Sequence, residues 1–198
     1  MKILLTIFVL LFSSSVLADD ISDFEIEGMS IGDSLLDYFS ENLINDNIVN
    51  ECLKVPNSCY LVEYPEFMSV TFNKLSSFKT YDFLVIYVKP NDRNFKIYSI
   101  NGIIDFNNIH QCTNKRDEIN KKLSEKFREA KKTYHLNEID FNFKSGRSIS
   151  IACYDWSKDK NSLLVSLHSK EYVNRKPSEG IDSLHPLEFY MFNINSLK

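Results

Sequence analysis

The chain has 198 residues, with 43% hydrophobic and 13% aromatic residues and only five Gly and five Pro. This composition supplies enough apolar side chains for a folded core, and it excludes a disordered chain or a flexible linker between domains. The formal net charge of −4 makes nucleic acid an unfavourable partner, because an acidic surface repels phosphate groups.

The first eighteen residues are typical of a secretory signal peptide. Met1-Lys2 provides a positive start, residues 3–17 are mostly apolar, and Ala18 precedes two Asp residues. An uncleaved anchor is the alternative, but the apolar run is shorter than the ~20 residues that span a bilayer. We therefore expect a periplasmic or secreted protein of residues 19–198, with no transmembrane segment after cleavage.

The periodicity of the chain changes at about Ser30. Residues 21–31 alternate between apolar and polar side chains, which predicts a short extended piece. From Ser30 the apolar residues recur on one helical face, and Ser30 stands where its side chain can accept a hydrogen bond from the N–H of Asp33. We therefore predict a helix over 30–43, ended by the turn-forming residues 45–47. Its apolar face consists of Leu35, Leu36, Phe39 and Leu43.

The chain contains four cysteines, Cys52, Cys59, Cys112 and Cys153. An even number in an exported protein predicts two disulfides, for which three pairings are possible. We favour Cys52–Cys59, which closes a short loop, together with Cys112–Cys153. A zinc site is the alternative, but there is no C-x-x-C pair and the His residues are scattered, so no metal site is expected. The four His are His110, His135, His168 and His185.

Strand-forming segments follow. Residues 81–89 are rich in β-branched and aromatic side chains, and the turn Pro90-Asn91-Asp92 separates them from 95–106. This pattern predicts a β-hairpin, in which Gly102 is a candidate for a bulge. Two shorter strand candidates precede the hairpin, over 59–63 and 68–72.

A long amphipathic helix is predicted over 114–134. Its apolar stripe consists of Ile119, Leu123, Phe127, Ala130 and Tyr134, and its outer face carries Lys121, Lys122, Lys126, Lys131 and Lys132. The basic face has two interpretations, a solvated helix surface or a patch for an anionic surface. Runs of charged residues usually form a solvated helix surface, which favours the first interpretation.

Strands return in the last third of the chain. The expected strands cover 139–144, 147–156 and 163–169, with a turn at 177–180 and a weak final strand at 187–194. Adjacent strands joined by short turns pair antiparallel, so we predict one α+β domain: a mainly antiparallel sheet with two amphipathic helices packed on it. Helix, strands and hairpin occur twice, so the halves 19–106 and 107–198 could be related by duplication.

Two short motifs resemble those of the GDSL (SGNH) hydrolases. They are Gly32-Asp33-Ser34-Leu35 and the D-x-x-H-P run Asp182 to Pro186. The resemblance implies a triad of Ser34, Asp182 and His185, in which the imidazole takes the serine proton and the carboxylate orients the imidazole. That family also needs a parallel sheet with several crossover helices, and Gly and Asn oxyanion donors, which this sequence does not predict. A serine ester hydrolase is therefore the alternative function.

Other stretches resemble a group of small exported proteins of marine alphaproteobacteria that have no assigned function. The stretches are IEGMSIGDSLLDYFSE (Ile26–Glu41), SINGIIDF (Ser99–Phe106), Cys112 with KRDEI (Lys115–Ile119), CYDW (Cys153–Trp156) and HSKEY (His168–Tyr172). The resemblance implies export and a shared fold, and it carries no catalytic residues. Its recurring cysteines support the Cys112–Cys153 pairing.

Gly28-Met29-Ser30 resembles the turn that opens a helix in outer-membrane assembly lipoproteins of the SmpA/BamE type. That resemblance implies a binding or assembly role, although no Cys for lipid attachment follows the signal. The leading expectation is thus a non-enzymatic module of the cell envelope that binds another protein or a small ligand and uses no cofactor.

Overall fold

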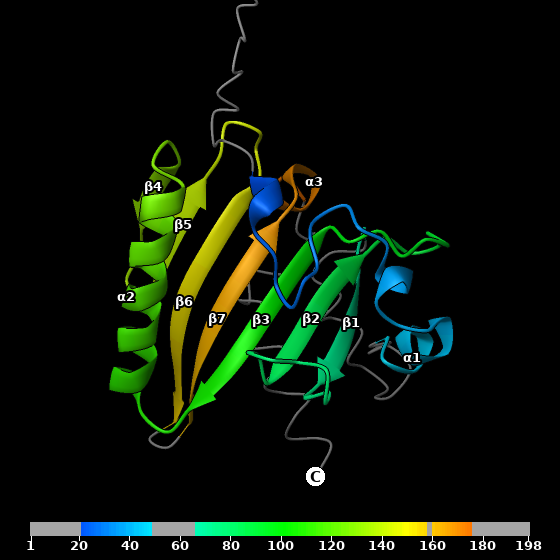
Figure 1. The fold of residues 1–198 in the computed structure, drawn as a ribbon, viewed down its shortest axis with the longest axis horizontal. Helices are drawn as coiled ribbons and strands as arrows, with labels where there is room; N and C mark the ends of the chain where they lie inside the picture. Colours follow the sequence, from blue (N-terminus) through cyan, green and yellow to red (C-terminus); the bar gives the residue numbers. More distant parts are fainter. Residues whose placement is uncertain (1–20, 49–65, 158–159, 176–198) are drawn as a thin grey trace, which may run out of the picture.

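The computed structural model describes residues 21–48, 66–157 and 160–175. These residues form a seven-stranded antiparallel sheet with the strand order β1-β2-β3-β7-β6-β5-β4 (Figure 1). The strands are β1 Met68–Asn73, β2 Phe83–Val88, β3 Ser99–Phe106, β4 Lys131–Tyr134, β5 Glu138–Asn142, β6 Ser148–Ser157 and β7 Lys160–His168. The helices are α1 Glu41–Asp46, α2 Ile109–Lys126 and α3 Lys170–Val173, with 3-10 turns at Ile21–Asp23 (η1) and Leu35–Asp37 (η2).

The α+β class and the β2–β3 hairpin are confirmed. Phe83 pairs with Ile103 and Ile86 with Ile100 across the hairpin. The two halves of the sequence share one sheet, because β3 pairs antiparallel with β7 along its whole length, from Ser99 opposite His168 to Phe106 opposite Asn161. A single core can therefore extend from β1 to β4.

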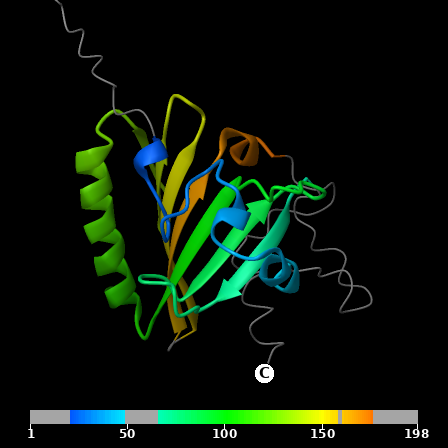
Figure 2. The same cartoon turned by 45° about the vertical axis from the view of Figure 1, so that its right-hand side comes forward.

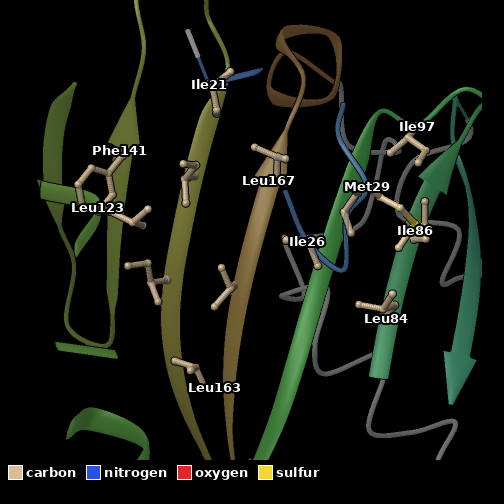
Figure 3. Close-up of a cluster of buried hydrophobic side chains, with 14 of the residues drawn as sticks. Ile21, Ile26, Met29, Leu84, Ile86, Ile97, Leu123, Phe141, Leu163 and Leu167 are labelled. Carbon is tan, nitrogen blue, oxygen red and sulfur yellow. The ribbon is translucent and has the colours of Figure 1, made fainter. Parts of the chain in front are cut away.

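The larger apolar cluster lies on one face of the sheet, and a smaller one, Val85, Ile103, Ala152 and Leu164, lies on the other face. On the first face the long helix α2 covers the β4–β6 side, and the segment 21–31 crosses β7, β3 and β2 (Figures 1 and 2). Figure 3 shows Ile26 and Met29 of this segment packed on the strands beside Leu84, Ile86 and Leu167. Each of these side chains has at most 1% of its surface exposed. An irregular segment thus takes the place of a second long helix on this face.

The segment 30–43 is not one helix, which corrects the prediction. Gly32 lies in a turn with a φ of 101°, Ser34 is extended, and Leu35 begins only a three-residue 3-10 turn. A separate helix, α1, starts after Ser40, whose side chain accepts a hydrogen bond from the N–H of Leu43. The end of this helix at Asp46 agrees with the turn predicted at 45–47.

The helix predicted over 114–134 is displaced toward the N-terminus. Asn108 caps α2 by accepting a hydrogen bond from the N–H of Gln111, and the helix ends at Lys126. Residues 131–134 form β4 instead, paired with β5 through Lys131 opposite Asn142 and Tyr134 opposite Ile139. Leu123 and Phe127 are buried as expected, whereas the side chain of Tyr134 is 63% exposed.

Two further predictions concern single residues. The disulfide between Cys112 of α2 and Cys153 of β6 is confirmed, with Cα atoms 6.0 Å apart. Gly102 is not a bulge, because it pairs in regular register with Leu84 and Val165. It is required for a close approach, since a Cβ there would stand 2.5 Å from the ring of Tyr81.

Several predictions fall outside the described residues. They are the signal peptide 1–18, the Cys52–Cys59 pairing, the strand at 59–63, the turn at 177–180 and the strand at 187–194. In the part of the chain that the structure describes, none of the helices combines the length and the apolar character that crossing a membrane requires.

Candidate functional site

The GDSL motif, Gly32-Asp33-Ser34-Leu35, has a structural role. The hydroxyl of Ser34 donates a hydrogen bond to the carbonyl of Asn94 at 2.7 Å and accepts one from the N–H of Leu36 at 3.3 Å. Its backbone forms a β-bridge with Lys96. The proton of Ser34 therefore points to a peptide oxygen, which cannot act as a general base at neutral pH.

Asp33 has a structural role as well. Its carboxylate accepts hydrogen bonds from the N–H of Ser30 at 2.8 Å and from the hydroxyl of Tyr38 at 2.6 Å. Burial and this hydrogen bond to Asp33 raise the pKa of Tyr38 to about 12. The predicted cap is thus reversed: the side chain of Asp33 accepts from Ser30, and the side chain of Ser30 does not cap a helix.

The other two residues of the hypothetical triad, Asp182 and His185, lie outside the described residues. Of the other His residues, His110 is exposed, His135 pairs with Asp140 at 3.3 Å, and His168 lies in the middle of the sheet. Among the residues that the structure describes, no three His, Cys, Asp or Glu side chains are arranged to hold a metal ion.

The structure does bring together a Ser–His pair that the sequence analysis missed. Ser99 Oγ lies 2.8 Å from His168 Nδ1, on neighbouring strands. Burial and, to a lesser extent, the charge of Arg175 lower the pKa of His168 to about 3, so the ring is neutral at pH 7. Ser99 has no exposed surface, so its hydroxyl cannot reach a substrate and the pair is structural.

This pair belongs to polar rows on the second face of the sheet. Side chains alternate along each strand, so the face opposite the larger core carries two rows rich in polar residues, next to the smaller apolar cluster of Ile103, Ala152 and Leu164. Cross-strand pairing places Ser69, Tyr87, Ser99, His168, Ser148, Asn142 and Lys131 in one row, and Thr71, Val85, Asn101, Ser166, Ser150, Asp140 and Thr133 in the next. The sequence signal for these rows is the Ser and Asn that alternate with Ile, Leu and Val in β3, β6 and β7.

Helix α3 folds over one end of this face. The side chain of Ser169 caps it by accepting a hydrogen bond from the N–H of Tyr172 at 3.0 Å. The ring of Tyr172 stacks on His168 with centroids 5.1 Å apart, and it also contacts Phe67 and Tyr87 at 5.2 and 4.9 Å. This aromatic cluster encloses the imidazole and is the physical cause of its lowered pKa.

Two carboxylates lie on the second face of the sheet, on strand β5. Glu138 and Asp140 of β5 are two residues apart, and the hydroxyl of Ser150 donates a hydrogen bond to Glu138. Burial raises the pKa of Asp140, and the charge of Glu138 raises it further, although His135 opposes this. Each carboxylate therefore has a protein partner, and both are oriented toward the second face rather than along the edge of the sheet.

Among the residues that the structure describes, the most exposed large apolar side chains lie at the β4–β5 hairpin. Leu136 at its tip is 94% exposed and Tyr134, two residues earlier, is 63% exposed. Single exposed apolar residues are common, but two together on one loop are less so. We call Tyr134 and Leu136 the hairpin tip.

The hairpin tip is held rigidly. The N–H of His135 donates to the carbonyl of Glu138 at 2.9 Å, which closes the hairpin. The carbonyl of Asn137 accepts a hydrogen bond from the N–H of Cys153 at 3.0 Å, and Cys153 is bonded to α2 through the disulfide. The loop therefore presents its two apolar side chains in a fixed position.

No family model matches the chain, and neither the curated proteins nor the solved structures yielded a match.

Proposed function

We propose that this protein is a non-enzymatic binding module of the cell envelope and that it contacts its partner through the hairpin tip. The observation that carries the proposal is the exposure of Leu136 and Tyr134 on a hairpin fixed by backbone hydrogen bonds and by the Cys112–Cys153 disulfide. Folding gains nothing from Leu136 in this position, because its apolar surface stays in water. A rigid anchor of this kind loses little conformational entropy on binding, which favours affinity.

Photo-crosslinking in the exporting cell tests this proposal. A benzophenone side chain at position 136 should give an adduct, with a protein of discrete mass or with lipid, whereas the same group at the exposed Lys144 on the β5–β6 loop should not. Adducts of equal yield from both positions, or none from position 136, would show that the hairpin tip is not a binding surface.

The alternative function, an ester hydrolase that uses Ser34, Asp182 and His185, requires the Ser34 hydroxyl to leave the Asn94 carbonyl. A hydrolysis assay on short-chain esters separates the two functions. Hydrolysis by the wild type that disappears in Ser34→Ala would support the enzyme. Equal background rates for both proteins would support the binding module.

A further inference from the structure

The segment that contains the hairpin tip is also the basic part of an acidic protein. Residues 109–136, which comprise α2, β4 and the tip, contain eight Lys and Arg and four Asp and Glu. Their formal charge is +4, so the rest of the chain carries −8 of the total of −4. This separation of charge creates a local positive potential beside the exposed apolar residues.

Several of these basic side chains are available to an outside partner. Lys121, Arg128 and Lys131 are exposed, and within the described residues none of them forms an ion pair. Two of the four acids are already paired inside α2: Glu118 with Lys115 and Lys122 at 2.9 and 2.6 Å, and Asp117 with Arg116 at 3.0 Å. The other two acids, Glu125 and Glu129, are exposed, but the formal charge of +4 leaves an excess of cations for an approaching partner.

Helix α2 lies beside strand β4 at one edge of the sheet. Lys132 of β4 donates a hydrogen bond from Nζ to Ser124 Oγ of α2 at 2.6 Å, which holds the strand beside the helix. Figure 1 shows α2 in front of β4 and β5 at the same edge of the sheet. The cations of α2 and the hairpin tip thus share this edge. We call this edge of the molecule the basic edge; it comprises Lys121 of α2, Arg128 after the helix, Lys131 on the opposite face of β4, and Tyr134 and Leu136 of the hairpin tip.

We infer that the basic edge binds the surface of a lipid bilayer that contains anionic headgroups. This inference rests on the proposed function and names the partner of the same hairpin tip. Lysines beside an anionic membrane each contribute favourable electrostatic free energy, and Tyr favours the interface between water and lipid. Leu136 inserts its side chain among the headgroups and upper acyl chains, while the lysines contact the headgroups.

The size of the apolar patch favours lipid over protein. A stable protein interface buries ~1,600 Å² in total with a core of several large side chains. Two apolar residues flanked by unpaired cations are too few for such a core, but they suit shallow, reversible adsorption to a membrane. The expected binding is therefore reversible and sensitive to salt, because salt screens exposed charges.

A local fluorescence reporter tests the inference on the full chain. The single native Trp is replaced by Trp156→Phe, and Tyr134→Trp places the reporter at the hairpin tip. Vesicles of phosphatidylglycerol and phosphatidylcholine at 3:7 should shift the emission to shorter wavelength, and brominated acyl chains should quench it. Pure phosphatidylcholine vesicles should cause neither change. The reporter responds to its own surroundings, so other contacts of the chain with the vesicle do not produce the signal.

Matched charge variants test the electrostatic part. Lys121→Gln/Lys131→Gln should raise the lipid concentration for the half-maximal shift about 25-fold, since each lysine is worth about five-fold. Lys79→Gln/Lys170→Gln removes the same charge from exposed sites on the β1–β2 loop and on α3, and should leave that concentration unchanged. All these substitutions are on exposed side chains, and circular dichroism checks that each variant folds.

The outcomes separate this inference from the proposed function. A shift that is equal with neutral vesicles, absent with anionic vesicles or unaffected by Lys121→Gln/Lys131→Gln overturns the lipid inference. If position 136 then still crosslinks to one discrete protein, the binding module stands with a protein partner. If it gives no adduct, both ideas fail.

Discussion

Glu27 offers the sharpest test of how the N-terminal segment is held on the sheet. Its carboxylate accepts three backbone hydrogen bonds from the β1–β2 loop: from Lys79 at 2.9 Å, Thr80 at 2.7 Å and Tyr81 at 3.0 Å. Glu27 and Gly28 are the central residues of a tight turn, with φ of 52° and 80°, between the buried Ile26 and Met29. The carboxylate therefore joins the turn that carries two core residues to a loop more than fifty residues away.

The substitution Glu27→Gln keeps the size of the side chain and removes its charge. A hydrogen bond to a charged group contributes about 1.5–3 kcal/mol. Gln retains one acceptor oxygen, but its NH₂ group replaces the second acceptor and opposes a backbone N–H donor. Because the carboxylate is partly exposed, the expected loss at pH 7 is about 2 kcal/mol of the free energy of unfolding. For a chain of this length the loss lowers Tm by about 4–8 °C.

The effect also has a defined pH dependence. Burial raises the pKa of Glu27, but the three backbone hydrogen bonds outweigh burial and lower the pKa below its ordinary value of 4.5. Because the folded pKa is the lower one, the stabilisation is complete above about pH 4.5 and is lost as the pH falls through the folded pKa. The difference between wild type and Glu27→Gln should therefore shrink below pH 4.5.

Urea unfolding followed by circular dichroism at pH 7 and at several pH values down to 3 measures both effects. Glu25→Gln is the matched control, because Glu25 is exposed on the same segment. Equal urea midpoints for wild type and Glu27→Gln at pH 7 would refute the reasoning, and so would a difference that stays constant down to pH 3.

Three further predictions concern other parts of the fold. Ser34→Ala should lower the free energy of unfolding by about 1 kcal/mol in urea, because it removes a cap and a hydrogen bond to a distant loop. Cys112→Ala/Cys153→Ala should cost about 4 kcal/mol in the same assay, because the disulfide closes a loop between residues 41 positions apart. The pKa of His168 is lowered to about 3 by burial and by Arg175, so stability should fall as the pH drops from about 6.5 toward 3, by up to about 1.4 kcal/mol per pH unit. His168→Asn should remove that slope in urea titrations at successive pH values.

Each of these predictions has an outcome that contradicts it. A Ser34→Ala variant as stable as the wild type would mean that the Asn94 contact does not contribute. Identical stability of the wild type and the double Cys variant would mean that residues 112 and 153 are not bonded in the folded protein. An unchanged pH slope in His168→Asn would assign the acid sensitivity to another group.

Local sequence preferences predicted most of the strands, and the number of cysteines predicted disulfides without fixing their partners. Tyr81 to Phe106 reads as a hairpin because β-branched and aromatic residues flank Pro90-Asn91-Asp92, and these preferences act within a few residues. An even number of cysteines likewise predicts disulfides without any knowledge of the fold. Composition and periodicity therefore sufficed for the α+β class and for most of the sheet.

Tertiary contacts decided the segment that contains GDSL. Its apolar spacing fits a helix, but the N–H of Gly32 donates to the carbonyl of Ile97 at 2.9 Å, and the N–H of Leu35 donates to Phe95 at 3.1 Å. These long-range bonds satisfy backbone groups that a helix would have paired internally, so the chain forms a turn and a β-bridge here in place of a helix. The spacing of local residues cannot predict a partner sixty positions away.

The same reason applies to the end of α2 and to the hairpin tip. Phe127, Ala130 and Tyr134 continue the helical spacing, yet pairing with β5 turns residues 131–134 into a strand and places Tyr134 in solvent. Helical spacing indicates which residues could share a buried face, but only the folded sheet determines whether something covers them. The sequence by itself thus established the basic segment, whereas the tertiary structure placed an exposed Leu and Tyr beside it.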